Sequence, residues 1–331
     1  MADYAVVGAT SWGTTLAWLL ARNGHRTWLV ARDDGEARRV DSRRGIDRLP
    51  GLVLPSLVST CGPEDIPAGL TGMIAAVPAQ AMRSTLLALP ALREVPALSA
   101  AKGIELTSGL RMTEVLLDLG WHTTDVACLS GPNLSHEIAS GLPAAAVVGA
   151  ATTAVGAAWQ VALSGGAFRV YHTDDVVGVE LAGALKNVIA IAAGAAVGLG
   201  MGANTVAAIL TRGLAEVTRL GVAMGARQAT FLGLAGVGDM AATCYSPLSR
   251  NRQLGELLAR GQSLAQAVVT IGEAVEGIQT APVALELARR KGVAAPITEQ
   301  VCSVLAGTSS VASAMGELLA RPPGAESKPE A

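Results

Sequence analysis

The chain has 331 residues, and its 25 Lys and Arg nearly balance its 27 Asp and Glu, giving a formal net charge of −2. Half of the residues are hydrophobic, whereas 16% are charged and 3% aromatic, so aliphatic side chains carry the hydrophobicity. This composition excludes intrinsic disorder, and the near-neutral charge supplies no net field that would attract a nucleic acid. The length predicts about two domains, each large enough for its own core.

Two long uncharged stretches, residues 138–168 and 187–211, raise the question of a membrane span. Both are rich in Ala and interrupted by Gly or polar residues, which is typical of buried helices rather than bilayer spans. The amino terminus lacks the basic segment of a signal peptide, and the four cysteines and four histidines show no metal-ligand spacing. We therefore expect a cytoplasmic protein with reduced thiols, no membrane span and no metal.

The first 30 residues contain a strand, a glycine-bearing turn, a helix and a second strand. Residues 4–7 and 27–30 are short apolar runs, and leucines at helical spacing lie between them. This order is that of a βαβ unit. Further strand-like runs separated by helical segments predict an α/β fold with a doubly wound, mostly parallel sheet; these runs are residues 73–77, 95–100, 126–129 and 144–148.

The first turn, Gly8-x-Thr10-x-x-Gly13, is similar to the dinucleotide-binding fingerprint, in which glycines let the backbone approach a pyrophosphate. Thr10 stands where the middle glycine is usual and adds a Cβ there; the alternative is an ordinary βα turn. Arg32, at the end of the second strand, favours the 2′-phosphate of NADP, and Asp33 keeps NAD open. A solvated loop arginine is the alternative for Arg32.

The pattern changes near residue 173, after which helix-period segments follow one another. The expected helices are residues 176–197, 205–224, 252–260, 283–291 and 298–306. We therefore predict a Rossmann-like NAD(P)-binding domain over residues 1–172, a helical substrate-binding domain over 173–320, and a disordered tail over 321–331.

Lys186 lies in a predicted helix, residues 181–196, that is otherwise almost free of charge. Burial disfavours the charged form of a lysine, so we expect a lowered pKa that suits proton transfer near neutral pH. The alternative is a lysine that extends from the helix edge to solvent.

Three further groups of polar residues follow predicted strands or begin a predicted helix. Lys102 and the segment 130–133 follow strand ends, where α/β sheets bind ligands. Arg250, flanked by Ser249 and Asn251, offers a guanidinium and two hydrogen-bonding side chains to a phosphate. A helix start capped by Ser249 is the alternative reading.

Taken together, these segments resemble the bacterial NAD(P)-dependent glycerol-3-phosphate dehydrogenases over about residues 4–310. The resemblance rests on GATSWGTTLAWLLARNGH, AAKGIE, LSGPNLSHEIASGLP, LAGALKNVIAIAAG, RGLAEVTRLGVAMGA, TFLGLAGVGDMAATC, SPLSRNRQLG and VEGIQTA. It implies a Rossmann domain followed by a helical domain, with the active site in the cleft between them.

The resemblance also implies a role for each matching residue. Lys186 would be the proton acceptor and donor, Lys102 and Asp239 would assist it, and the charge of Lys102 would help to lower its pKa. The implied substrate-binding residues are Lys102, Gly131, Asn133, Lys186, Asp239, Ser249, Arg250 and Asn251. The implied cofactor-binding residues are Gly8, Ser11, Trp12, Gly13, Arg32, Lys102, Ser135, Arg250 and Glu276.

Three positions depart from the family pattern: Thr10 replaces a glycine, Asn133 stands where Ser or Thr is usual, and Ser135 replaces an alanine. We predict the interconversion of dihydroxyacetone phosphate and sn-glycerol 3-phosphate, with NADP preferred over NAD, for phospholipid synthesis. One alternative is a related dehydrogenase that acts on another phosphorylated hydroxy or keto compound. The other is a non-catalytic cofactor-binding protein, which would not need Lys186. The sequence does not define the oligomeric state, and a homodimer is one option.

Overall fold

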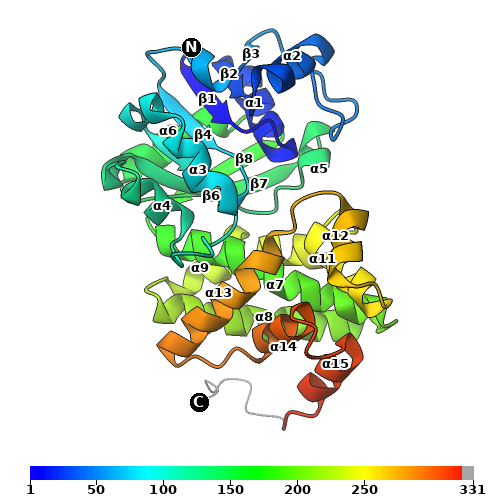
Figure 1. Ribbon diagram of the computed structural model, residues 1–331. Coiled ribbons are helices and arrows are strands. Elements are labelled where there is room, and N and C mark those ends of the chain that lie inside the picture. Colours follow the sequence, from blue (N-terminus) through cyan, green and yellow to red (C-terminus); the bar gives the residue numbers. More distant parts are fainter. Residues whose placement is uncertain (323–331) are drawn as a thin grey trace. The chain divides into compact units, whose positions relative to one another are not determined.

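The computed structural model describes residues 1–322, and the chain divides into two compact units. The first unit comprises Met1–Lys102 and Leu110–Val176, and the second comprises Gly103–Gly109 and the chain from Val177 onward. Figure 1 shows strands and helices in the first unit and helices in the second. Residues 323–331 of the tail that was expected to be disordered lie outside the described residues.

The first unit is built on one sheet with the strand order β3-β2-β1-β4-β5-β6-β7-β8. Neighbouring strands are parallel, except that β7 runs antiparallel to β6. This arrangement confirms the prediction of an α/β fold with a mostly parallel sheet. The strands are β1 (Asp3–Val7), β2 (Arg26–Val30), β3 (Val58–Cys61), β4 (Gly72–Ala75), β5 (Ala97–Ser99), β6 (Val126–Ser130), β7 (Ala144–Ala150) and β8 (Phe168–Thr173).

Helices cover both faces of this sheet (Figure 1). On one face, Leu16, Leu20 and Trp159 belong to a buried apolar cluster, and on the other face Met82 and Leu116 belong to a second cluster. The helices of this unit are α1 (Ser11–Arg22), α2 (Asp34–Arg43), α3 (Met82–Leu87), α4 (Met112–Asp118), α5 (Ser135–Ala139) and α6 (Thr153–Leu163).

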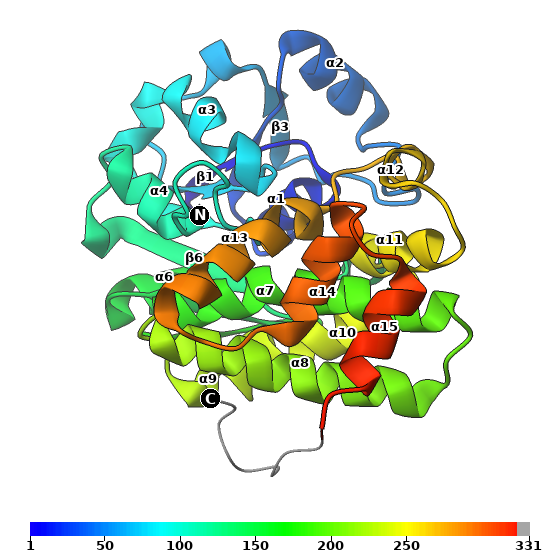
Figure 2. The same ribbon diagram turned by 60° about the horizontal axis from the view of Figure 1, so that its bottom comes forward.

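The second unit is helical, as predicted. Its helices are α7 (Val176–Gly198), α8 (Ala203–Ala223), α9 (Gln228–Phe231), α10 (Asp239–Tyr245), α11 (Arg250–Ala259), α12 (Leu264–Ile271), α13 (Glu276–Lys291), α14 (Pro296–Leu305) and α15 (Val311–Leu319). Figure 2 shows α7 in the interior of this group, with α8, α13 and α14 around it.

Helix α7 contains the first part, residues 187–198, of one uncharged stretch that raised the membrane question. The other stretch, residues 138–168, was expected to be helical but contains strand β7 before α6. Within residues 1–322 helix α7 alone is long and apolar enough to cross a bilayer, and 89% of its most apolar window is buried inside the protein. Its small side chains let neighbouring helices approach: a Cβ on Gly194 would lie 1.9 Å from the carbonyl oxygen of Arg252. Helix α7 is therefore packed as the core helix of its unit.

A buried carboxylate joins α8 to the start of α14. Glu216 accepts hydrogen bonds from the backbone N–H groups of Ile297 and Thr298, each at 2.9 Å, and from the Thr298 hydroxyl at 2.5 Å. Burial raises the pKa of Glu216, whereas these hydrogen bonds act in the opposite direction. The carboxylate thus satisfies donors that the first turn of a helix leaves unpaired.

We expect Glu216→Ala to lower the free energy of unfolding by roughly 1–3 kcal/mol, because it leaves buried N–H groups of α14 without an acceptor. Chemical denaturation of the full chain measures this change. Glu286→Ala is the control, because Glu286 forms an exposed ion pair with Arg290 on α13, and such pairs contribute little. Equal losses in the two variants would contradict the capping role.

Candidate active site

The glycine-rich turn joins β1 to α1 and is closed by a threonine. Gly8 has φ +110°, a conformation that favours glycine, and a Cβ on Gly13 would lie 2.0 Å from the Gly8 carbonyl oxygen. Thr10 has φ −79° and is the N-cap of α1: its hydroxyl accepts from the Gly13 N–H at 3.0 Å and donates to the Ala76 carbonyl at 2.9 Å. The threonine in place of the middle glycine therefore fits the turn and ties it to the end of β4.

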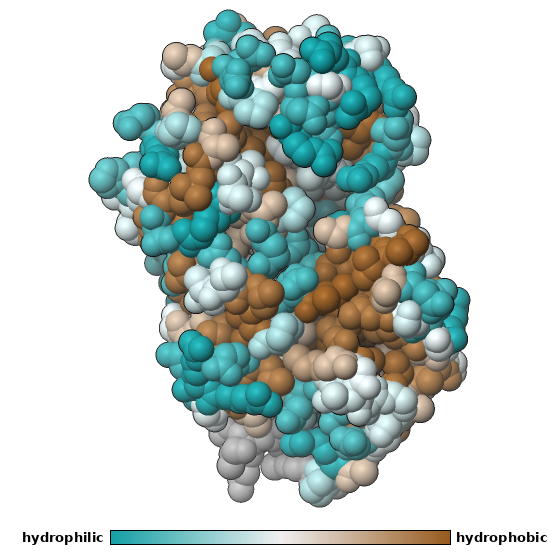
Figure 3. All heavy atoms as spheres, viewed as in Figure 1, coloured by the Kyte–Doolittle hydropathy of each residue, from teal (hydrophilic) through white to brown (hydrophobic). Residues whose placement is uncertain are grey.

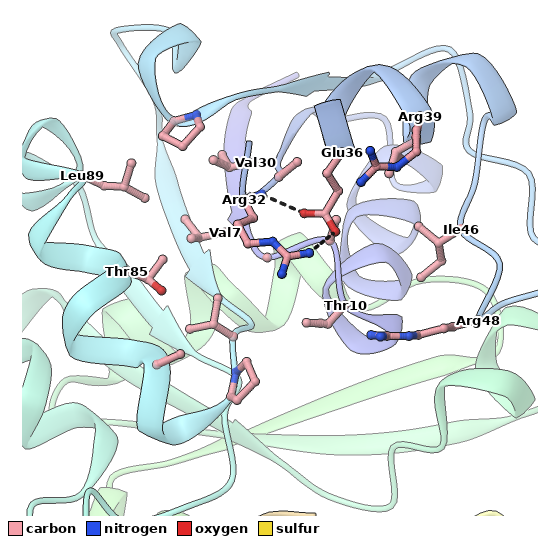
Figure 4. Close-up of a pocket in the computed structure, with 18 of the residues that line it drawn as sticks. Val7, Thr10, Val30, Arg32, Glu36, Arg39, Ile46, Arg48, Thr85 and Leu89 are labelled. Atoms are coloured by element: carbon pink, nitrogen blue, oxygen red, sulfur yellow. Dashed lines mark hydrogen bonds and ion pairs between the residues drawn. The ribbon is translucent and has the colours of Figure 1, made fainter. Parts of the chain in front are cut away.

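A pocket of about 700 Å³ opens beside this turn, at the carboxyl ends of β1, β2 and β4 (Figure 4). Val7, Val30 and Val77 contribute apolar walls, and Leu89 adds to them from the segment after α3. Volumes of this size are typical of small-molecule and cofactor sites. The place agrees with the rule that doubly wound sheets bind ligands beyond the carboxyl ends of their strands.

The predicted cofactor residues of the first unit divide between this pocket and its surroundings. Gly8 and Arg32 line the pocket, and so does Thr10, which was named as a departure from the family pattern. The indole of Trp12 instead packs edge-on against Phe168, at 6.4 Å between ring centroids. The lining does not include Ser11, Trp12, Gly13, Lys102 or Ser135.

Arg32 and the start of α2 form the polar wall of the pocket. Asp33 is the N-cap of α2, and its carboxylate accepts from the Glu36 N–H at 2.8 Å. This hydrogen bond lowers the pKa of Asp33. Glu36, which sequence reasoning missed, lines the pocket and pairs with Arg32. The carboxylate next to Arg32 in the pocket is therefore that of Glu36.

Lys102 and the loop after β6 lie together in the first unit. The Lys102 ammonium donates to the Gly131 carbonyl at 2.8 Å. Gly131 has φ +134°, and a Cβ there would lie 2.9 Å from the Ala145 carbonyl oxygen, so the loop requires glycine. Both polar atoms of the Asn133 side chain are buried with no hydrogen-bond partner within residues 1–322. A buried amide without partners is costly, so this side chain is a candidate ligand-binding group.

In the second unit, Lys186 lies on α7 and is buried. Its ammonium forms an ion pair with the Asp239 carboxylate and donates to the Thr243 hydroxyl at 2.7 Å. The Thr243 hydroxyl in turn donates to the Asp239 carbonyl at 2.6 Å. A carboxylate in direct contact with the ammonium favours the charged form of the lysine and opposes the effect of burial.

The backbone before Asp239 has an unusual geometry that positions its side chain. Asp239 is the first residue of α10 and follows a π-helical turn over Leu234–Gly238. Gly236 interrupts the helical angles in this turn, and a Cβ there would lie 2.0 Å from the Phe231 carbonyl oxygen. π-Helical turns are frequent at functional sites.

Ser249, Arg250 and Asn251 begin α11. The Ser249 hydroxyl caps the helix by accepting from the Arg252 N–H at 3.3 Å. The Asn251 amide donates to the Asn187 side chain at 3.0 Å and accepts from the Gly277 N–H at 2.9 Å, which joins α11, α7 and α13. The first contact agrees with the alternative that Ser249 caps a helix start, and the contacts of Asn251 add to the stability of this helix end.

Arg250 and Glu276 take different positions at these helix ends. The Arg250 guanidinium is 45% exposed and pairs with Glu273 at 3.1 Å. Glu276 is the first residue of α13, and its carbonyl accepts from the Thr280 hydroxyl at 2.9 Å. Arg250 is thus the cation among the predicted phosphate-binding residues of this unit.

The chain matches two models of one protein family. The model of the NAD-dependent glycerol-3-phosphate dehydrogenase N-terminus matches residues 3–155, and that of the C-terminus matches residues 175–316. The chain belongs to the NAD-dependent glycerol-3-phosphate dehydrogenase family. It is 45% identical over 327 residues to a glycerol-3-phosphate dehydrogenase (NAD(P)+) of Frankia casuarinae, with 97% of each chain covered. It is 42% identical over 330 residues to an enzyme of that name from Stenotrophomonas maltophilia, covering 98% and 96% of the two chains.

A solved structure of this family has the same fold. The crystal structure of glycerol-3-phosphate dehydrogenase from Coxiella burnetii superposes with a TM-score of 0.90 at 32% identity and covers 97% of this chain and 99% of that one. A D-mandelate dehydrogenase complex with NADH, at 12% identity and a TM-score of 0.62, shares the fold alone. The predicted resemblance is thereby confirmed, as are the enzyme class, an NAD(P)-dependent oxidoreductase acting on a CH–OH group, and the small phosphorylated substrate of the family.

The cofactor of the dehydrogenase family fits the residues of the first unit. The cradle over residues 8–13 has no room for a Cβ at Gly8, where one would lie 2.9 Å from the Val77 side chain. A close backbone approach of this kind suits a diphosphate at a helix N-terminus. The guanidinium groups on the α2 side of the pocket suit a phosphorylated ribose.

Proposed function

We propose that the chain reduces dihydroxyacetone phosphate to sn-glycerol 3-phosphate with NADPH or NADH and also catalyses the reverse oxidation. The observation that carries this proposal is the buried group of Lys186, Asp239 and Thr243, in a chain that matches the family over nearly its whole length. The product would supply glycerophospholipid synthesis in the cytoplasm.

The glycine-rich turn and the pocket bind the cofactor. When bound, the nicotinamide cofactor supplies the hydride that reduces the C2 carbonyl, or accepts it in the reverse direction. The first turn of α1, which includes Ser11 and Trp12, directs the helix N-terminus toward the diphosphate. Arg32 lies where the second strand ends and favours a 2′-phosphate.

Each unit contains candidate groups for binding the substrate. Arg250 binds the phosphate group, since a guanidinium forms paired hydrogen bonds with a phosphate, and the N-terminus of α11 adds a favourable dipole. Lys102, Gly131 and Asn133 bind the glycerol moiety. The buried amide of Asn133, which has no hydrogen-bond partner within residues 1–322, supports this role.

Lys186 moves the proton at the C2 oxygen. In reduction, its ammonium donates a proton to the oxygen as the carbonyl becomes an alkoxide, and in oxidation the neutral amine takes the proton back. The Asp239 carboxylate stabilises the ammonium form before transfer, and the Thr243 hydroxyl fixes the direction of one N–H. These two partners hold the charged group in a buried position where it would otherwise be unfavourable.

A second candidate is the same reaction on another phosphorylated hydroxy or keto compound. Asn133 favours it, because a carboxamide carries its acceptor oxygen and its donor nitrogen on separate atoms and extends further from the backbone than the Ser or Thr hydroxyl that is usual at this position. The reaction type and the role of Lys186 would be unchanged.

Absorbance at 340 nm separates these candidates. The wild-type chain is assayed with NADPH and with NADH, using dihydroxyacetone phosphate and a panel of other phosphorylated ketones. The highest kcat/KM with dihydroxyacetone phosphate supports the proposal. A much higher value with another ketone supports the second candidate, and cofactor binding without turnover of any ketone would overturn both.

We expect NADPH to be the preferred cofactor and Arg32→Ala to reduce that preference by about fivefold. The Arg32 side chain is 79% exposed, so its pairing with a 2′-phosphate gains the modest energy of a solvent-exposed ion pair, about 1 kcal/mol. The measurement is kcat/KM for both cofactors in the wild type and the variant.

The control for Arg32→Ala is Arg38→Ala. Arg38 is an exposed arginine of α2 that does not line the pocket, so its removal changes the net charge equally. A wild type that prefers NADH, or equal shifts in the two variants, would show that Arg32 does not recognise the 2′-phosphate.

A further inference from the structure

The α2 side of the pocket carries charges of both signs. Figure 3 shows the hydrophilic surface over α2, and Figure 4 shows the side chains that line the pocket beneath it. Asp47 forms an ion pair with Arg43 at the outer edge, where both side chains are more than half exposed. The charged lining residues are Arg32, Arg39, Arg43, Arg48, Glu36 and Asp47.

Glu36 places a carboxylate beside the end of β2, where acidic side chains of dinucleotide-binding folds bind the adenosine ribose. Its Oε2 accepts from the backbone N–H of Arg32 at 2.9 Å, and its Oε1 pairs with the Arg32 guanidinium at 3.3 Å. The carboxylate therefore lies against the backbone just beyond the end of β2. In dinucleotide-binding folds an acidic side chain near this point accepts from the ribose 2′-OH.

Asp33 does not compete for this role. Its carboxylate caps α2 by accepting from the Glu36 N–H at 2.8 Å, and it is absent from the lining of the pocket. The side chain of Glu36 is 22% exposed, and Figure 4 shows it beside Arg32 in the pocket. Of Asp33 and Glu36, only Glu36 therefore places its carboxylate in the pocket, beside Arg32.

We propose that Glu36 determines cofactor specificity: its carboxylate accepts from the 2′-OH of an unphosphorylated adenosine ribose and repels a 2′-phosphate. This inference rests on the proposed function. Glu36 thereby limits the preference for NADPH that the pocket arginines create, and it keeps NADH as a usable cofactor. Arg32, Arg39 and Arg48 provide the opposing attraction.

Glu36 has two effects on a 2′-phosphate, and they differ in size. First, Glu36 pairs with Arg32 and so orders a guanidinium that can bind the 2′-phosphate. This effect is small, because Arg32 is 79% exposed and an exposed i,i+4 ion pair contributes little free energy. Second, the Glu36 carboxylate and a 2′-phosphate are both negative and repel each other at a separation of a few ångströms. Water screens this repulsion less in a partly enclosed pocket than in open solution. Repulsion therefore outweighs ordering, and removal of the charge strengthens binding of the phosphorylated ribose.

The test uses Glu36→Gln in the full chain and two cofactor fragments without nicotinamide, ADP-ribose and 2′-phospho-ADP-ribose. Glutamine retains an oxygen that can accept from the Arg32 N–H, so the start of α2 keeps its structure. Isothermal titration calorimetry gives Kd for each fragment. We expect the ratio of the ADP-ribose Kd to the 2′-phospho-ADP-ribose Kd to rise roughly tenfold in the variant.

The control is Asp41→Asn, which removes the same charge from the same helix. Asp41 is exposed, pairs with Arg44 and does not line the pocket, so we expect a change in the ratio below twofold. An unchanged ratio in Glu36→Gln would overturn the proposal. A fall in the ratio would also overturn it and would make Glu36 a residue that positions Arg32.

Fragment binding also separates this proposal from the proposed function. If the expected shift occurs but no ketone is reduced, the proposed reaction fails and the specificity role of Glu36 stands. If dihydroxyacetone phosphate is reduced but the ratio does not move, the specificity role fails and the reaction stands. Failure of the wild type to bind either fragment would overturn the specificity role of Glu36, and the ketone assay would decide the reaction separately.

Discussion

Lys186→Ala is expected to lower kcat by roughly 10²–10⁴-fold while the Kd for NADPH changes by less than twofold. Lys186 is the buried cation of the second unit that Asp239 and Thr243 hold, whereas the cofactor pocket is lined by residues of the first unit. Loss of the ammonium removes the proton donor for the C2 oxygen but leaves the glycine-rich turn unchanged. Steady-state kinetics and cofactor fluorescence measure the two quantities.

Two further variants make the result for Lys186 specific. Lys186→Arg retains a positive charge beside Asp239 but cannot release a proton near neutral pH, so we expect it to fold and remain inactive. Lys291→Ala removes an exposed lysine at the end of α13 and is expected to retain full activity. If Lys186→Ala retained a kcat near that of the wild type, Lys186 would be a structural residue and the proposed mechanism would be wrong.

The interior of the sheet could be predicted from the sequence, and its edges could not. The missed strands, β3 and β8, are the two edge strands. β8 alternates buried and exposed residues and contains Arg169, Tyr171 and His172, so it lacks the continuous apolar run that indicates an interior strand. Apolar runs therefore identify strands that have a neighbour on each side, whereas an edge strand can be identified only once its pairing with the next strand is known.

Some helical residues of the second unit were not predicted, because they precede a proline or belong to short helices. Helix α13 begins at Glu276 and continues through Pro282, whereas the helical period in the sequence predicted a start at residue 283. Proline removes a backbone donor, so it is unfavourable inside a helix and weakens the helical signal of the residues before it. The unpredicted helices α9, α10, α12 and α15 have four to nine residues. Helices of this length depend on packing more than on propensity, and packing is not visible in the pattern.

Some residues of the candidate site could also be predicted from the sequence, and others could not. Lys186 could be singled out because a lysine in an otherwise uncharged apolar segment, residues 181–196, is unusual, but its partner Thr243 gave no local signal. Asp33 and Glu36 show the limit most clearly. Both follow β2 closely, and only the start of α2 decides that the first caps the helix while the second faces the pocket. Residues that gain their role from a helix boundary need that boundary to be known within one residue.

Arg250→Ala is expected to raise KM for dihydroxyacetone phosphate about tenfold and to leave KM for phosphate-free dihydroxyacetone nearly unchanged. A charge-assisted hydrogen bond to a phosphate contributes about 1.5–3 kcal/mol. Arg250 is 45% exposed and paired with Glu273, so binding a phosphate requires it to exchange one anion for another, and the lower end of that range applies.

The control for Arg250 lies at the other end of the same helix. Arg260 follows α11, is 62% exposed and pairs with Glu256, so Arg260→Ala removes an equal charge from a comparable ion pair. We expect its KM for both ketones to stay within twofold of the wild type. If Arg250→Ala raised KM equally for both ketones, Arg250 would support the fold of α11 and would not recognise the phosphate. If KM rose only for the phosphorylated ketone, and only in Arg250→Ala, the phosphate would bind at the N-terminus of α11. Arg250 would then be its main ligand there, because the side chains of Ser249 and Asn251 already form hydrogen bonds that stabilise this helix end.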